Sequence, residues 1–179
     1  MRTSIALLLV GVISAACSPA TPSLRPSAGP TIAATSGPTS RESTLTLADA
    51  SDCPVTKPGQ APAQIGDQLF GSSSAFGNED LWVGGLSGDG VILADSRFAQ
   101  ADGSIEWKFG WWRIASGSLA ISGRRLDAPA PPLHASVPSG YGLSGFQASG
   151  VSFPTGGCWE VTGSVGDSAV AFVTFVLRT

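Results

Sequence analysis

Glycine and proline interrupt this chain so often that long helices are excluded. From residue 44 to the C-terminus, 20 glycines and 8 prolines leave only two stretches of more than ten residues without either, 91–102 and 167–179. Both residue types are unfavourable inside helices, and glycine is favoured in tight turns. Only 13% of the residues are charged, which also excludes a coiled coil and a charged disordered chain. The chain is therefore expected to form short strands joined by turns.

The first seventeen residues have the pattern of an export signal. Arg2 supplies a positive charge, and residues 5–13 form an uninterrupted run of apolar and small residues that is too short to span a bilayer. Residues 14–17 read Ser-Ala-Ala-Cys and resemble the lipobox of bacterial lipoproteins, with Ser14 where that motif usually has Leu or Val. The resemblance implies that residues 1–16 are removed and that Cys17 is lipidated, which anchors the exported protein to the bacterial cell envelope. Ordinary cleavage, giving a secreted protein, is the alternative.

The number of cysteines links the N-terminus to the rest of the chain. There are three, and acylation of Cys17 leaves Cys53 and Cys158 as an even pair in an oxidising compartment. A pair of metal thiolates is the alternative, but the sequence offers too few further soft ligands. We therefore expect a Cys53–Cys158 disulfide. It would close a loop of about 105 residues, worth roughly 4 to 5 kcal/mol in the chain-entropy model.

Composition divides the mature chain into two parts. Residues 17–43 combine the lipidated cysteine with a segment rich in Pro, Ser, Thr and Ala, which is expected to be a disordered linker. Residues 44–179 are enough for a single domain. This domain has 7 Lys and Arg residues against 12 Asp and Glu residues, a net charge of −5. Because phosphate binding depends on clustered cations, no nucleic-acid partner is expected, and the predicted membrane contact is the N-terminal lipid.

Short apolar runs separated by turn residues predict the strands of the domain. The turn sequence Ser-Gly-Asp-Gly at 87–90, between two apolar runs, predicts a hairpin. Pro54, Pro58 and Pro62 predict extended or irregular backbone for residues 48–76, which should wrap the domain. The spacing predicts an antiparallel β-sandwich. The expected strands are 81–86, 91–94, 104–112, 118–125, 145–153, 158–163 and 168–178, with a proline-rich crossover at 128–138.

The C-terminal third carries a resemblance to known domains. Residues 157–163 read Gly-Cys-Trp-Glu-Val-Thr-Gly and, with the strand that follows, resemble the closing hairpin of immunoglobulin-like domains. Together with 108–113, 123–132 and 140–150, they resemble a family of uncharacterised bacterial secreted or lipoprotein domains over about half of the chain. The resemblance implies an immunoglobulin-like antiparallel β-sandwich with 7–8 strands and no particular activity. Strand alternation points Trp159 and Val161 to the core and Cys158 and Glu160 outward.

Several catalytic motifs are present only in part. Gly140, Gly142 and Gly145 have the Gly-x-Gly-x-x-Gly spacing, but a strand rather than a helix follows, so no nucleotide site is expected. The Gly-x-Ser sequences at 85–87 and 142–144 lack the final glycine of a nucleophile elbow, and His134 is the single histidine. These residues predict no serine hydrolase, no metal and no cofactor.

A candidate binding face arises from the aromatic residues of the strand at 104–112. Alternation places Trp107, Phe109 and Trp111 on one face and Trp112 on the other. Either Trp112 packs beneath the proline-rich loop at 129–132, or it lies exposed beside cations as a surface for sugar rings or a peptide. The candidate face comprises Trp112, Arg113, Arg124, Arg125 and Tyr141.

The sequence thus favours a membrane-tethered extracytoplasmic binding or interaction domain whose partner is a glycan or an envelope protein. One alternative is a hydrolase of envelope glycans that uses two of the carboxylates of Asp95, Glu106, Asp127 and Glu160. The other is a purely structural or sensory ectodomain. The pattern indicates neither the ligand nor the oligomeric state.

Overall fold

The computed structural model describes residues 44–69 and 74–179. The predicted signal peptide, Cys17 and the predicted linker lie outside the described residues. Within the part that is described, no helix is long and apolar enough to cross a membrane.

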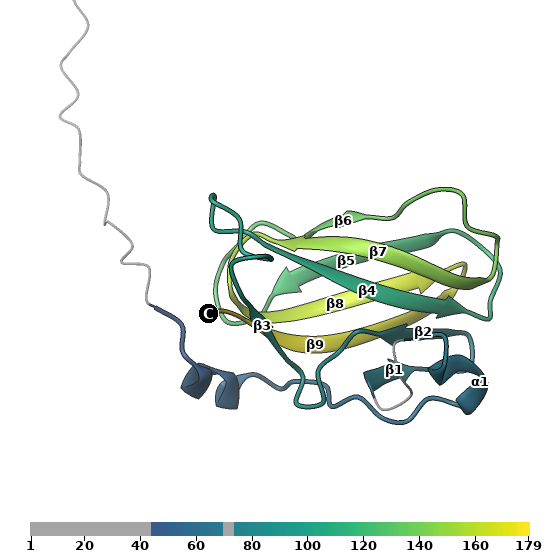
Figure 1. The fold of residues 1–179 in the computed structure, drawn as a ribbon, viewed down its shortest axis with the longest axis horizontal. Coiled ribbons are helices and arrows are strands. Elements are labelled where there is room, and N and C mark those ends of the chain that lie inside the picture. Colours follow the sequence, from purple (N-terminus) through teal and green to yellow (C-terminus); the bar gives the residue numbers. More distant parts are fainter. Residues whose placement is uncertain (1–43, 70–73) are drawn as a thin grey trace, which may run out of the picture. The chain divides into compact units, whose positions relative to one another are not determined.

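Nearly all the regular structure is β-strand (Figure 1). Two short helical segments precede the strands, the 3₁₀-helix η1 (Leu47–Asp52) and α1 (Ala63–Gly66). The strands are β1 (Ala75–Gly77), β2 (Leu81–Gly84), β3 (Val91–Ala94), β4 (Ile105–Arg113), β5 (Leu119–Arg125), β6 (His134–Ser136), β7 (Gly145–Phe153), β8 (Gly157–Val165) and β9 (Ser168–Arg178).

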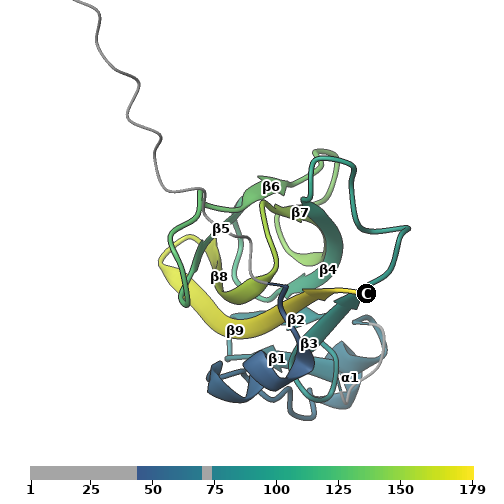
Figure 2. The same cartoon turned by 90° about the vertical axis from the view of Figure 1, so that its left-hand side faces the viewer.

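The strands form two packed sheets, so the fold is a β-sandwich, as the sequence predicts. One sheet has five strands in the order β1-β2-β4-β7-β6, and the other has four in the order β3-β9-β8-β5. Figure 2 shows the two layers close to end-on. Strands β1 and β6, which the sequence did not predict, form the two edges of the larger sheet. They are only three residues long, which explains why no alternating pattern revealed them.

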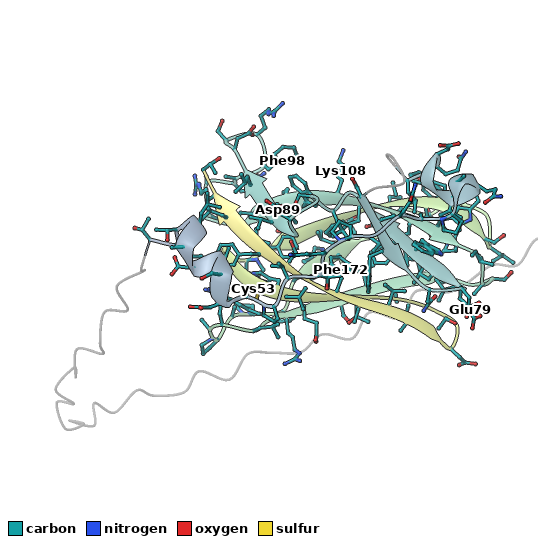
Figure 3. The ribbon with its side chains drawn as sticks, turned by 90° about the horizontal axis from the view of Figure 1, so that it is seen from below. Cys53, Glu79, Asp89, Phe98, Lys108 and Phe172 are labelled. Carbon is teal, nitrogen blue, oxygen red and sulfur yellow. A yellow bond between two sulfur atoms is a disulfide. The ribbon has the colours of Figure 1, made fainter. Side chains whose placement is uncertain are left out.

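The predicted closing hairpin is confirmed. Strands β8 and β9 pair antiparallel along their length, from Gly157 opposite Val176 to Val165 opposite Ser168. Trp159 and Val161 are buried in the core between the sheets, whereas Glu160 faces outward to Arg124. The largest buried side chains are aromatic, and Phe172 of β9 lies among them with its ring centroid 5.3 Å from that of Phe109 (Figure 3).

The hairpin predicted for residues 81–94 is wrong. Gly90 N–H does donate to Ser87 O at 3.0 Å, so the turn forms. The strands on either side of it, however, belong to different sheets: β2 pairs antiparallel with β4, and β3 pairs parallel with β9. The sandwich is therefore not purely antiparallel. The turn residues specify a reversal of the chain, but the partner of each strand is decided by which sheet buries its apolar residues.

The N-terminal segment covers the outer face of the smaller sheet. Cys53 and Cys158 form the expected disulfide, with their Cα atoms 5.6 Å apart. Both cysteines pack with Phe175 and Leu177 on the face opposite the main core, and Figure 3 places Cys53 beside η1. Thr56 N–H donates to Val173 O at 2.8 Å. The disulfide therefore fastens the N-terminal segment to the outer face of the smaller sheet, which is the face that alternation along β8 predicts for Cys158.

Candidate functional site

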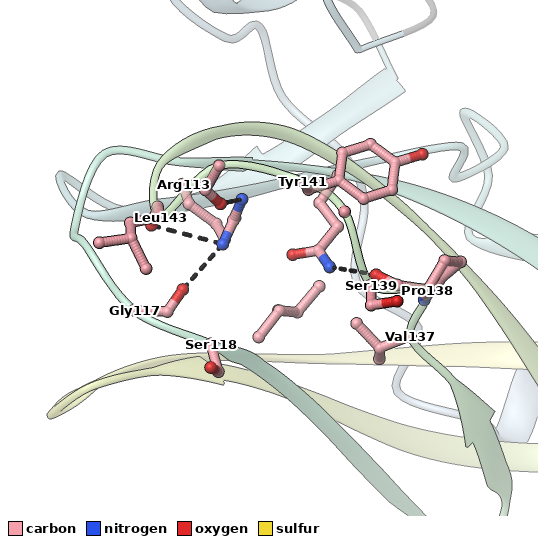
Figure 4. Close-up of a pocket in the computed structure, with 12 residues that line it drawn as sticks. Arg113, Gly117, Ser118, Val137, Pro138, Ser139, Tyr141 and Leu143 are labelled. Carbon is pink, nitrogen blue, oxygen red and sulfur yellow. Dashed lines mark hydrogen bonds between the residues drawn. The ribbon is translucent and has the colours of Figure 1, made fainter. Parts of the chain in front are cut away.

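A cavity of about 350 Å³ opens at one end of the sandwich (Figure 4). Its walls come from three places: the end of β4 with the connection to β5, the connection from β6 to β7, and the start of β7. The lining residues are Arg113, Gly117, Ser118, Leu119, Val137, Pro138, Ser139, Gly140, Tyr141, Gly142, Leu143 and Gln147. The middle of the sandwich is filled by aromatic side chains. At this end, where the connections meet beyond the sheets, a space is left.

Arg113 is the charged residue of the cavity. It is in phase with Phe109 and Trp111 along β4, so alternation turns its side chain into the space between the sheets, where only 3% of it is exposed. Nη1 donates to Gly117 O at 2.7 Å, and Nη2 donates to Gly142 O at 2.6 Å. The guanidinium thereby joins the β4–β5 and β6–β7 connections. Two longer contacts, to Leu143 O and Ser144 O, complete a ring of carbonyl oxygens.

Gln147 is the second polar residue buried in the cavity wall. It occupies an inward position of β7, with 6% of its surface exposed, and its Nε2 donates to Pro138 O at 3.0 Å. Its Oε1 accepts no hydrogen bond. In the described part of the chain, Gln147 Oε1 and Arg113 Nε are the two buried side-chain polar atoms without a partner. Both atoms are inaccessible to water, so they lie behind the surface of the cavity, and only other atoms of the two side chains can face it.

The rim of the cavity is the β6–β7 connection. Gly140 has a φ of 95° and Gly145 a φ of 82°, conformations that glycine adopts without strain. The glycine spacing that the sequence analysis discounted as a nucleotide motif thus shapes this loop, and a strand follows it, as expected. Leu143 and Tyr141 are exposed by 71% and 40%, and the Tyr141 ring centroid lies 6.3 Å from that of Phe146. Apolar and aromatic side chains therefore lie on this part of the rim.

The five residues of the predicted binding face do not share one surface. Trp112 is half-buried on the outer side of the larger sheet, packed with the segment that holds Ala61, Ile65 and Leu69. It lies neither beneath the proline-rich loop nor beside Arg113, whose side chain points to the opposite face. Trp112 is thus partly buried, as one of the two readings expected, but the residues that cover it are 61–69 rather than the proline-rich loop.

The other members of that set lie apart from Trp112 as well. Arg124 and Arg125 belong to β5 in the smaller sheet, where Arg124 pairs with Glu160 at 2.9 Å and Arg125 with Asp127 at 2.7 Å. Of the predicted five residues, the structure brings Arg113 and Tyr141 together, in the cavity.

Three of the four carboxylates proposed for hydrolysis have other partners, and the fourth, Glu106, is exposed on β4. Asp127 and Glu160 form the ion pairs just described, and Asp95 pairs with Arg97 at 2.7 Å. The hydrogen bond from Arg97 lowers the pKa of Asp95. Burial raises the pKa of Asp127, but hydrogen bonds from Arg125 and the Cys158 backbone outweigh it and lower the pKa overall. A glycosidase acid needs a raised pKa, so Asp95 and Asp127, whose pKa values are lowered, do not have the electrostatics of that role.

The remaining catalytic candidates are dispersed. His134 is exposed on the edge strand β6, and among the described residues no side-chain hydrogen bond joins its imidazole to a serine. The described part of the chain also contains no group of three or more His, Cys, Asp or Glu residues able to hold a metal ion. Asp127 lies with Asp49 and Asp52 around a smaller hollow of about 200 Å³ beside the disulfide.

Comparison with known proteins adds no assignment. The chain matches no protein-family model and no curated protein. The resemblance to a family of uncharacterised bacterial domains therefore stays a prediction from the quoted residues.

Gln147 is the residue of the site that the sequence analysis missed. The signal for it was present, because residues 147, 149, 151 and 153 alternate in phase and the last two are apolar core residues. A glutamine and a serine at core positions mark the part of β7 where the interior becomes polar. Ser149 is used by Trp111, whose Nε1 donates to its hydroxyl at 3.0 Å, whereas Gln147 faces the cavity.

Proposed function

We propose that this protein is a non-enzymatic binding domain, tethered at the bacterial cell envelope, and that its ligand enters the cavity at the end of the sandwich. The observation that carries the proposal is the cavity itself, whose wall holds two buried polar side chains, Arg113 and Gln147, at inward positions of β4 and β7. Burying polar side chains costs free energy, which favours a role for the cavity beyond filling space. The hydrolase alternative has no comparable support, because three of its four carboxylates, Asp95, Asp127 and Glu160, are paired with arginines.

The tether is the second part of the proposal. It is supported by the export signal, by the small residues that precede Cys17 and by the disulfide, since stable disulfides form in oxidising compartments. Two acyl chains on Cys17 would give stable attachment, whereas one chain binds membranes only marginally. The immunoglobulin-like relationship belongs with this proposal too. It is supported by the Gly-Cys-Trp motif at the start of β8 and by the β8–β9 hairpin.

The tether is tested by intact-mass measurement of protein extracted from membranes of the bacterium that makes it. The expected mass is that of residues 17–179 plus acyl groups, minus two protons for the disulfide. A Cys17→Ser variant should move to the soluble fraction. A soluble, non-acylated wild-type protein would overturn the tether but not the binding role.

The binding role is tested by a ligand screen with the full exported protein. The panel contains neutral sugars, amino acids, hydroxy acids and short peptides, and binding is followed by calorimetry. Ser139→Trp places an indole ring in the cavity wall and should abolish binding. Ser96→Trp introduces the same side chain at an exposed position in the β3–β4 connection and should leave binding unchanged. Equal binding by both variants, or no binding by any compound, would contradict the proposed site.

A further inference from the structure

The connection between β5 and β6 contains three closely spaced prolines. Residues 128–132 read Ala-Pro-Ala-Pro-Pro, so Pro129 and Pro132 have the Pro-x-x-Pro spacing. A proline ring fixes its own φ at about −65°, and the residue before a proline is restricted to extended backbone. Residues 129–133 belong to no helix, strand or turn. These restrictions together favour the polyproline II conformation for the segment.

Burial along the segment follows the three-residue period of a polyproline II helix. Ala130 packs against the main core and Leu133, three residues later, is buried in it. Pro129, Pro131 and Pro132 are all exposed. In β6, which follows, exposure instead alternates at every second residue, as in a strand. One side of the segment therefore lies on the domain, and the three exposed prolines form a ridge, here called the proline ridge.

Contacts on both sides hold the proline ridge in place. Before it, Leu126 N–H donates to Cys158 O at 2.7 Å. After it, Leu133 N–H donates to Gly123 O at 3.2 Å, and a Cβ atom added to Gly123 would overlap Cδ2 of Leu133. Within the part of the chain that the structure describes, residues 128–132 themselves make no backbone hydrogen bond. The ridge is thus fixed at its ends in one conformation, which lowers the entropy cost of binding a partner.

We propose that the proline ridge is a docking site for a second protein that has a groove lined by Trp and Tyr rings. Such grooves bind polyproline II segments with the Pro-x-x-Pro spacing. Because the helix repeats every three residues, the pairs 128–129 and 131–132 face the same groove. The residues that point away from the groove are then Ala130 and Leu133, which are the two that the domain itself holds.

The charge of the surrounding chain agrees with this kind of partner. Residues 128–159 contain no Asp, Glu, Lys or Arg. Arg125, just before the ridge, pairs with Asp127 at 2.7 Å and donates to Thr155 Oγ1 at 3.0 Å. Recognition of the ridge therefore depends on the shape and packing of its rings, which aromatic side chains supply, rather than on charge.

The proline ridge is separate from the cavity. Strand β5 begins at Leu119 in the cavity wall and ends at Arg125, on the side of the ridge. Strand β6 begins next to the ridge and is followed by Val137, in the cavity wall. The two sites thus lie at opposite ends of the same two strands. Docking on the ridge goes beyond the proposed function and does not depend on a ligand in the cavity.

The first test titrates the full exported protein with a panel of isolated WW, SH3 and EVH1 domains. All three classes bind polyproline II ligands in aromatic-lined grooves. Calorimetry should detect binding by at least one of these domains, and a synthetic polyproline peptide should displace it from the protein. Failure of the whole panel to bind, or binding that polyproline does not displace, would overturn the proposal.

The second test removes single rings from the ridge. Pro129→Ala and Pro132→Ala should each weaken binding of that domain about tenfold, because apolar ring surface is no longer buried in the groove. Pro62→Ala removes an exposed ring at the N-cap of α1 and is the matched control, which should bind as the wild type does. If the prolines only stiffen the connection, the ridge variants will be less stable but will bind normally at temperatures where they are folded. That result would refute the proposal.

Discussion

Gly163 offers a sharp test of how the two sheets pack. It lies at an inward position of β8, between Val161 and Val165, and a Cβ atom added to it would overlap Cζ3 and Cη2 of Trp111 across the core. Cε3 of the same ring would lie 3.1 Å away. The φ of Gly163 is not in the left-handed region, so the backbone itself accepts alanine. The cost of Gly163→Ala therefore reports the contact with Trp111.

The magnitude follows from two opposing effects. Adding a methyl group to a filled core costs about 1 to 3 kcal/mol of unfolding free energy, and the lower entropy of the unfolded chain returns about 0.4 to 1 kcal/mol. We expect Gly163→Ala to lower the unfolding free energy by about 1 to 2 kcal/mol. Trp111→Phe removes the overlapping atoms, so in that background Gly163→Ala should cost nothing or slightly stabilise the protein.

Urea unfolding followed by circular dichroism measures all four members of this double-mutant cycle. Gly150→Ala is the control, because its added Cβ would meet only Ser136 Cβ, at an ordinary contact distance of 3.9 Å. The expected coupling between the substitutions at positions 163 and 111 is about 1 to 3 kcal/mol, whereas distant sites add within about 0.5 kcal/mol. Additive effects would refute the packing of Trp111 on β8, and with it the register that carries Arg113 into the cavity.

Three other perturbations test the outer parts of the domain. Reducing the disulfide between Cys53 and Cys158 should lower the unfolding free energy by roughly 4 kcal/mol if loop closure dominates. Urea titrations with and without reductant measure this change. A change below about 1 kcal/mol would show that loop closure does not dominate. Asp127→Asn removes an ion pair with Arg125 and should cost up to about 1 kcal/mol at pH 7 after allowance for solvent screening. Because the folded pKa of Asp127 is lowered, this contribution is present above the unfolded pKa and lost as the pH falls through the folded value, so variant and wild type should converge once the pH is below the folded pKa. Gly157 has a φ of 131°, and a Cβ added to it would contact the Arg125 guanidinium. Gly157→Ala should therefore cost about 1 to 3 kcal/mol of unfolding free energy in the same urea titration. No cost would rule out the left-handed backbone at residue 157.

Local chemistry was enough to predict the closing hairpin and the disulfide. Residues 157–178 contain two long alternating strands around one tight turn, so the pairing of β8 with β9 needs no information from elsewhere in the chain. The same alternation determines that Trp159 is buried and that Cys158 lies on the opposite face. The count of cysteines then leaves Cys53 as its partner. The prediction holds where the two paired strands are adjacent in sequence.

Partners that are distant in sequence were beyond such reasoning. The turn at 87–90 is read correctly as a reversal, yet β3 pairs in parallel with β9, which lies more than seventy residues further along the chain. Trp112 is covered by residues 61–69, a segment whose prolines indicate only that it is irregular. In both cases the decisive contact is made by a distant part of the chain, about which the local residue pattern contains no information.

The candidate site shows a third kind of limit, because the pattern was present but was interpreted too simply. Alternation along β4 puts Arg113 on the face of Phe109 and Trp111, and alternation along β7 puts Gln147 on the face of Val151 and Phe153. Polar residues at core positions reduce stability unless they are satisfied, so each is either paired within the protein or retained for binding. Here the protein satisfies both Nη atoms of Arg113 and the Gln147 amide nitrogen through backbone carbonyl oxygens, and both side chains line one cavity. The coincidence of the two at the same end of the sandwich is the reason for assigning the ligand site there rather than to the aromatic residues of the outer face.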